Sequence, residues 1–160
     1  MKGFLNKGLQ NYVPDNMKEL IFYAGNIDIR FHIFNPNRPG TPKEKIQTLI
    51  DRLGTELLSL NLDKVTCVKL IPIESEERKI PGTGQLDKKN FYGSFEQRQA
   101  AVKMFNTELQ RMCEKNGFDI LTWNFDYDQE LDFGFMEARQ SVHLRPTAYF
   151  DHNYEQTKLF

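Results

Sequence analysis

Strand-like runs alternate with amphipathic helical segments along this chain, and the alternation limits its fold more than any other feature. Residues 19–25, 64–73 and 118–125 are short apolar runs of the kind that form buried strands. Each of the two longer segments between them carries one apolar stripe at helical spacing: Ile46, Leu49, Ile50, Leu53 and Leu57 in the first, and Val102, Phe105, Leu109 and Met112 in the second. Strands joined by helices pair in parallel through right-handed crossovers. The sequence therefore predicts an α/β fold with a mainly parallel sheet.

Both helical segments carry signals that indicate where they begin or end. Thr41 with Glu44, and Ser94 with Gln97, have the spacing of a capping box, in which side chains satisfy the first N–H groups of a helix. Gly117 follows the second stripe and is expected to end that helix. Open parallel sheets bind ligands beyond the carboxyl ends of their strands, so a site is expected in the segments that follow the strands.

Length, charge and cysteine content are typical of a one-domain globular protein. We expect one domain over all 160 residues, with residues 1–17 as a polar lead-in. A net charge of −1 offers no basic excess for binding nucleic acid or an anionic membrane. The sequence has no apolar run of membrane-spanning length and no signal-peptide core, so a cytoplasmic location is expected. Cys67 and Cys113 are expected to be buried free thiols.

A line of polar residues follows the first strand run. From residue 27 to residue 33 apolar side chains alternate with Asp28, Arg30 and His32, so an extended backbone would place these three on one face. One interpretation is a half-solvated strand with ordinary surface residues. The other is a polar cluster, in which Asp28 pairs with Arg30 or His32 and fixes a loop or site. Gly25 just before it favours the cluster, because glycine at a strand end lets a ligand or backbone come close.

Other candidate chemistry lies toward the C-terminus. His143 could act as a general base, although a lone histidine is more often structural. The acidic residues between 126 and 137 approach the spacing of a calcium loop, but Leu131 occupies the position that requires glycine. The three histidines and two cysteines show no metal-ligand spacing. We therefore expect no metal and no cofactor.

Three stretches resemble a known family. "LIFYAGNIDIRFHI" (residues 20–33), "FYGSFEQRQAAVKMFNTELQRMCEKNGFDIL" (91–121) and "SVHL" (141–144) resemble the SGNH/GDSL hydrolase superfamily, in order and in spacing. The likeness is greatest to members with a "GEIDCRxH"-like third block and covers residues 18–146. It implies a flavodoxin-like three-layer sandwich and the hydrolysis of small esters, frequently acyl groups on sugars.

The resemblance also implies roles for individual residues. His143 would be the general base, Gly25 and Asn26 would donate hydrogen bonds to the oxyanion, and Asp28 would be the acid of the third block. Supporting roles would fall to Arg30, His32 and Gln140, the last standing where the family usually has the acid that orients the histidine.

The first-strand block of the family, with its Gly-Asp-Ser nucleophile, is missing from this chain. Ser94 is interpreted as a helix cap, so no nucleophile is identified. Without that strand, residues 19–25 would leave an apolar sheet edge unpaired. Residues 1–13 could replace it, another chain or a second copy could pair there, or the chain could be part of a longer protein. Two functions stay open: hydrolysis or recognition of an acyl-ester ligand, probably a carbohydrate, or an inactive module that binds a partner through this edge.

Overall fold

The computed structural model describes residues 2–73, 91–123 and 125–129. The ordered elements, in chain order, are α1 (Lys2–Lys7), the 3-10 helix η1 (Leu9–Asn11), β1 (Glu19–Phe22), α2 (Asn26–Asp28), the π-helix η2 (Ile29–Ile33), α3 (Pro42–Ser59), β2 (Lys64–Val68), α4 (Phe95–Asn116) and β3 (Asp119–Leu121). All described residues together contain no helix that is long and apolar enough to span a membrane.

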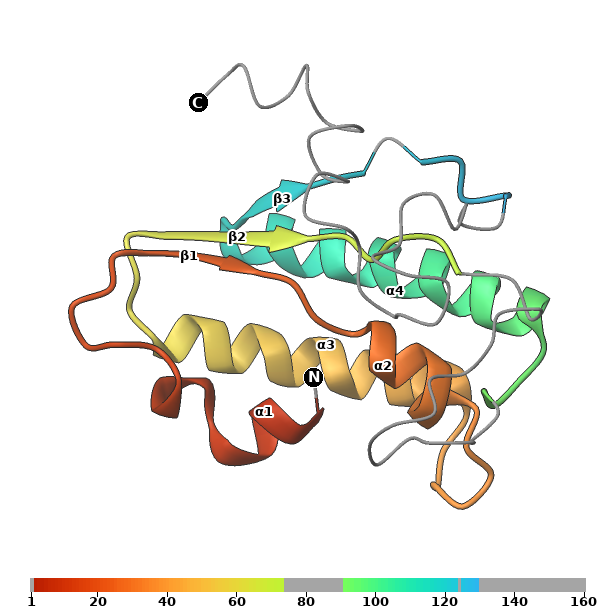
Figure 1. Ribbon diagram of the computed structural model, residues 1–160. Coiled ribbons are helices and arrows are strands. Elements are labelled where there is room, and N and C mark those ends of the chain that lie inside the picture. Colours follow the sequence, from red (N-terminus) through yellow and green to blue (C-terminus); the bar gives the residue numbers. More distant parts are fainter. Residues whose placement is uncertain (1, 74–90, 124, 130–160) are drawn as a thin grey trace, which may run out of the picture.

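The three strands form one parallel sheet in the order β1-β2-β3. Leu20 is paired with Val65, and Cys67 is paired with Ile120, so β2 is central and β1 and β3 are its two neighbours. Helices α3 and α4 connect consecutive strands and both lie on the same face of the sheet (Figure 1). The predicted α/β fold with a parallel sheet is confirmed. The second helical layer of a three-layer sandwich stays a prediction.

The core lies between the sheet and this pair of helices. All nine residues of the two predicted stripes are buried: Ile46, Leu49, Ile50, Leu53, Leu57, Val102, Phe105, Leu109 and Met112. Cys67 and Cys113 are free and buried in the same core, as predicted. The two helices approach closely at Gly54, where an added Cβ would stand 3.1 Å from Cγ of Met112. A side chain at this position would therefore require Met112 to shift by a few tenths of an ångström.

Both predicted capping boxes are present. The hydroxyl of Thr41 accepts the N–H of Glu44 at 3.3 Å, and that of Ser94 accepts the N–H of Gln97 at 3.3 Å. Gly117 adopts a left-handed conformation, with φ of 70°, directly after α4. The predicted starts of both helices and the predicted end of the second are confirmed.

The N-terminal segment is helical and packs on the side of α3. Leu5 and Leu9 are buried, and the guanidinium of Arg52 donates to the carbonyl of Leu5 at 2.9 Å and to Oδ1 of Asn6 at 3.0 Å. Residues 2–11 were expected as part of a polar lead-in or as a replacement strand. The predicted replacement strand is wrong, because this segment is helical and its Leu5 and Leu9, four residues apart, pack against α3.

Strand β1 is less buried than its composition predicted. Ile21 is 68% exposed, and in the described part of the chain β1 is paired on one side alone, with β2. Strand β2 is shorter than the predicted run of residues 64–73, because regular pairing ends at Val68 although Leu70, Ile71 and Ile73 remain buried.

Candidate functional site

Gly25 lies beyond the carboxyl end of β1 and is positioned by the core. Its φ of 128° lies in a region that residues with a side chain rarely adopt. A Cβ here would stand 3.0 Å from Cζ of Phe105 and 3.2 Å from Cδ2 of Leu70. The close approach that the sequence suggested at this glycine is therefore an approach of the backbone to the protein's own side chains.

The extended conformation predicted for residues 27–33 is wrong, because α2 and η2 form a short helix there. The N–H of Ile29 donates to the carbonyl of Gly25 at 3.0 Å and closes the first turn. Ile29 and Ile33, one turn apart, are both buried, which shows that the apolar residues also fitted a helical spacing. Asp28 and His32 are likewise one turn apart, whereas Arg30 is not on their face of the helix.

Asp28 and His32 lie close together beside α3. The side chain of Asp28 is almost fully buried, and both residues line a cavity of about 580 Å³. Burial lowers the pKa of His32 below its ordinary value, and the positive charge of Arg38 lowers it further. The carbonyl of Phe31 and the carboxylate of Asp28 oppose this shift. The imidazole is therefore largely neutral near pH 7.

Arg30 belongs to the interior of the protein. Its side chain is 1% exposed, and its backbone carbonyl accepts the N–H of Tyr92 at 3.0 Å. A second buried arginine, Arg98, stacks over the ring of Phe91 at 5.1 Å, and that ring meets Phe31 edge-on at 5.2 Å. These contacts connect η2 with the segment before α4. The half-solvated strand with surface residues is thus wrong for Arg30 and for Asp28.

Aromatic residues that the sequence analysis did not single out gather beyond the strand ends. The side-chain amide of Asn26 donates to the hydroxyl of Tyr23, and the ring of Tyr23 stands edge-on to Trp123 at 6.2 Å. The indole N–H of Trp123 donates to the carbonyl of Lys69 at 2.8 Å. These residues come from the ends of all three strands, so no local pattern could have predicted the cluster.

Tyr127, which follows β3 in the sequence, contacts the same region. Its hydroxyl donates to the carbonyl of Leu70 at 2.6 Å, and burial raises its pKa to about 12. The ring is therefore neutral throughout the physiological range and serves as a hydrogen-bond donor.

The two serines among the described residues, Ser59 and Ser94, form hydrogen bonds at the ends of helices. Ser94 accepts the N–H of Gln97 and donates to Glu96 at 2.7 Å, which confirms its interpretation as a helix cap. Ser59 donates to the carbonyl of Glu56 at 2.7 Å at the end of α3. Neither hydroxyl is bonded to a histidine, as an activated nucleophile would be.

Several predicted features lie outside the described residues. These are His143, Gln140, most of the long connection over residues 74–93 and the acidic stretch beyond Gln129. Within the described residues, no group of three or more His, Cys, Asp or Glu side chains could hold a metal ion. Of the acidic stretch, Asp128 pairs with Lys103, and the carboxylate of Asp126 accepts the N–H of Asp128 at 2.8 Å.

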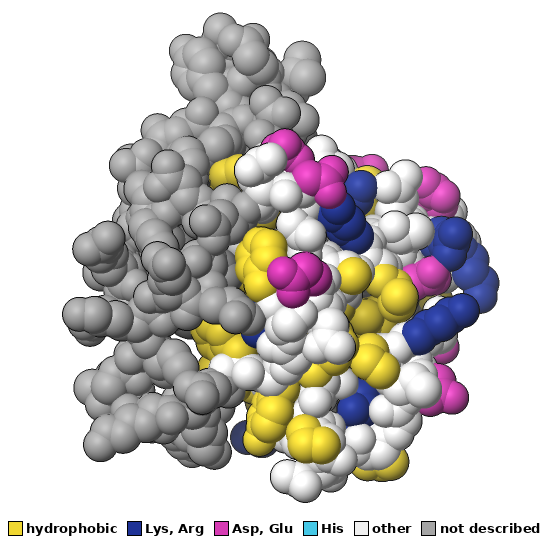
Figure 2. Space-filling view, turned by 90° about the vertical axis from the view of Figure 1, so that its right-hand side faces the viewer, with side chains coloured by type: hydrophobic (Ala, Val, Ile, Leu, Met, Phe, Trp, Pro, Cys, Tyr) yellow, Lys and Arg dark blue, Asp and Glu magenta, His cyan; other side chains and the backbone are white. Residues whose placement is uncertain are grey.

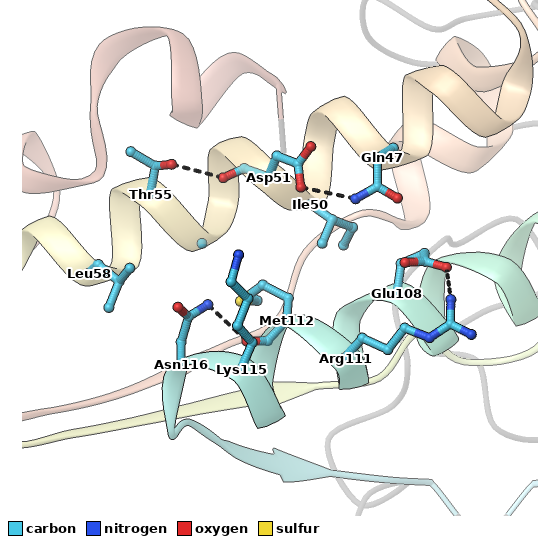
Figure 3. A pocket seen from close by; sticks show the side chains of 11 residues that line it. Gln47, Ile50, Asp51, Thr55, Leu58, Glu108, Arg111, Met112, Lys115 and Asn116 are labelled. Atoms are coloured by element: carbon cyan, nitrogen blue, oxygen red, sulfur yellow. Dashed lines mark hydrogen bonds and ion pairs between the residues drawn. The ribbon is translucent and has the colours of Figure 1, made fainter.

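A second cavity, of about 400 Å³, opens between α3 and α4. Figure 3 shows its polar rim, where Gln47 donates to Asp51 at 2.9 Å and Arg111 pairs with Glu108. Most polar side chains of this rim thus form a hydrogen bond or an ion pair within their own helix. This arrangement indicates a solvated helix surface rather than a binding site.

No family model matches this chain, and neither a curated protein nor a solved structure is similar to it.

Proposed function

We propose that this chain is an SGNH-like hydrolase, or a degenerate relative of one, that acts on or recognises an acyl-ester ligand, probably a carbohydrate, in a flavodoxin-like sandwich. The observation that carries the proposal is the position of Gly25 and Asn26. They stand beyond the carboxyl end of β1 in a parallel α/β sheet, where such sheets bind ligands. The sequence likeness of residues 18–146 to the superfamily supports the same assignment.

The chemistry of the proposal requires donors for an oxyanion and a base. The N–H of Gly25 and the side-chain amide of Asn26 would donate to the oxyanion. An amide nitrogen carries two hydrogens, and the bond to Tyr23 uses one of them. Asp28 would support the segment that contains Gly25 and Asn26. His143 would be the base, with Gln140 orienting its ring by a hydrogen bond. The nucleophile is not identified among the described residues.

A fluorophosphonate probe tests this proposal directly. The purified chain, His143→Ala and His152→Ala would be incubated with the probe, and intact masses would be recorded. We expect one adduct on the unaltered chain and on His152→Ala, and none on His143→Ala, because a base activates the nucleophile. Asn26→Ala should lower turnover of an activated ester by about 10²–10³-fold.

Absence of any adduct would overturn self-sufficient serine hydrolysis by this chain. An adduct of equal yield on His143→Ala would remove that residue as the base. Far-ultraviolet circular dichroism of each variant verifies that the fold is retained.

An alternative proposal is an inactive module that pairs with another chain through β1. The exposed side chain of Ile21 on a strand with one neighbour in the described sheet favours it. Self-pairing would make the mass measured by light scattering rise with concentration, and Ile21→Lys would abolish the rise. Leu58→Lys is the matched control, because Leu58 is 55% exposed on α3. A concentration-independent monomer would exclude self-pairing.

A further inference from the structure

The cavity beside Asp28 and His32 is enclosed by three separate segments. Its walls are the helical stretch after β1, the loop that contains Arg38, and one stripe of α3. Lys45, Leu49 and Arg52 on that stripe are spaced by four and three residues, so they share one face of the helix. We call this cavity the basic pocket. Its volume of about 580 Å³ is typical of small-molecule sites.

Two of the three cations of the basic pocket, Lys45 and Arg52, are held by hydrogen bonds to other segments of the chain. The ammonium of Lys45 donates to the carbonyl of Ile33 at 2.9 Å and to that of Asn35 at 3.3 Å. The guanidinium of Arg52 donates to Leu5 and Asn6. Lysine has three donors and arginine has five, so each keeps N–H groups for another acceptor. Ordering these long side chains in advance lowers the entropic cost of binding.

The basic pocket is lined by three cations, Arg38, Lys45 and Arg52, and by two carboxylates, Asp28 and Glu44, so its positive charge exceeds its negative charge by one. Among the described residues, no carboxylate forms an ion pair with Arg38, Lys45 or Arg52. The carboxylate of Glu44 accepts the N–H and hydroxyl of Thr41 in the capping box, which orients it at the helix end and leaves its negative charge in place. The chain as a whole has a net charge of −1, so this local excess of positive charge does not follow from composition.

Part of the lining of the basic pocket is apolar. Leu49 and the ring of Pro39 supply this part, whereas Ile33 is 1% exposed and offers a ligand almost no surface. The methylene stems of Lys45 and Arg52 add to this surface. An inorganic anion would satisfy the cations and leave this surface without a partner. A ligand with an anionic head and an aliphatic body would satisfy both parts.

We propose that the basic pocket binds an amphipathic anion, with a carboxylate or phosphate head held by Arg38, Lys45 and Arg52 and an aliphatic body packed on Pro39 and Leu49. This inference rests on the pocket alone and does not depend on ester hydrolysis. The two head groups share their recognition chemistry, since arginine binds both through paired N–H groups.

Calorimetric titration of the full chain tests this with three ligands of equal chain length: octanoate, octyl phosphate and octan-1-ol, each below its micellar concentration. We expect saturable binding of at least one anion and at least tenfold weaker binding of the neutral alcohol. The anion that binds more tightly identifies the head group. Acetate and inorganic phosphate should bind weakly, because they lack the aliphatic body.

Three variants locate the site. Arg38→Gln should weaken anion binding about tenfold or more, because a hydrogen bond to a charged group is lost. Arg38→Lys should restore most of the affinity, and Arg111→Gln is the matched control on the other cavity. His143→Ala should bind as the unaltered chain does, which separates this proposal from the hydrolase. Equal binding of octan-1-ol and the anions, an Arg38→Gln variant that binds like Arg111→Gln, or no saturable binding at all would overturn it.

Discussion

Asn106 on α4 holds both backbone groups of Leu70. Its Oδ1 accepts the N–H of Leu70 at 2.7 Å, and its Nδ2 donates to the carbonyl of Leu70 at 3.1 Å. Strand β2 has already ended at Val68, so this side chain takes the place of a neighbouring strand for one residue. A buried amide thus fixes the course of the chain where it leaves the sheet toward the candidate site.

Replacing Asn106 by alanine should destabilise the protein by about 2–4 kcal/mol, because two buried backbone groups lose a hydrogen-bond partner. The hydroxyl of Tyr127 would still bond the carbonyl of Leu70, so the N–H would bear the larger loss. Urea unfolding followed by circular dichroism measures the change. Thr107→Ala, an exposed neighbour on the same helix, should change stability by less than about 0.5 kcal/mol. Similar values for the two variants would contradict the role of Asn106.

Gly25→Ala should cost considerably more free energy of unfolding than Gly117→Ala. Both glycines have positive φ, so both variants are strained. Gly117 is left-handed, which costs a residue with a side chain about 1–2 kcal/mol, whereas Gly25, with φ of 128° and ψ of −21°, lies outside that region and should cost more. A Cβ at Gly117 meets nothing within 4 Å, whereas one at Gly25 meets Phe105 at 3.0 Å. The difference between the two free energies therefore combines the larger backbone strain at Gly25 with the steric cost, and we expect it to exceed about 1 kcal/mol. Equal costs would show that the core adapts to the added methyl group.

The free energy of unfolding should decrease as the pH is lowered, because His32 then takes up a proton. Burial first, and then the charge of Arg38, depress the pKa of the folded state below the ordinary 6.5, against the opposing effects of Phe31 and Asp28. The unfolded chain therefore binds the proton more readily, and stability is lost as pH falls from 6.5 through the folded pKa. Urea unfolding at pH 7.5 and 5.5 should show a smaller loss in His32→Gln. An unchanged loss would contradict the assignment, and His152→Gln is the control.

The two cysteine thiols should resist modification in the folded protein. Cys67 and Cys113 are 0% and 1% exposed, so a reagent cannot reach either sulfur in the folded protein. The hydrogen bond with Cys113 and burial also raise the pKa of Cys67, and the thiolate is the reactive form. The same hydrogen bond lowers the pKa of Cys113, so the protection of Cys113 comes from burial alone. Ellman's reagent should therefore release almost no chromophore without denaturant and two equivalents in 6 M urea. Rapid labelling of the native protein would indicate that α4 opens from the sheet on the timescale of the assay.

The sequence predicted those elements whose signals are local. Caps at Thr41 and Ser94 and the two apolar stripes act within one helix, so spacing alone was sufficient. The same approach failed for residues 27–33, because a seven-residue alternation fits a strand while Ile29 and Ile33 also fit a helical turn. Here the helix buries Ile29 and Ile33 in the core, and these contacts join residues far apart in the chain.

The candidate site was predictable only in part. Asp28 and His32 were expected to be neighbours and are, although through a helix instead of a strand. Lys45 and Arg52 were not predicted as site residues, since cations on the polar side of an amphipathic helix are common. Their importance depends on Ile33 and the N-terminal helix, whose carbonyls hold them, and no pattern within α3 indicates those partners.

Strand β2 pairs with β1, and β3 pairs with β2, so the sheet can grow in the order in which the strands are synthesised. During synthesis, residues 19–68 supply β1, α3 and β2, which can form a complete βαβ unit before α4 has emerged from the ribosome. The apolar stripe of α3 can then be covered early, by β1 and β2. Helix α4 and β3 can add to a surface that already exists. Growth in the direction of synthesis shortens the time for which strand edges stay open to other nascent chains.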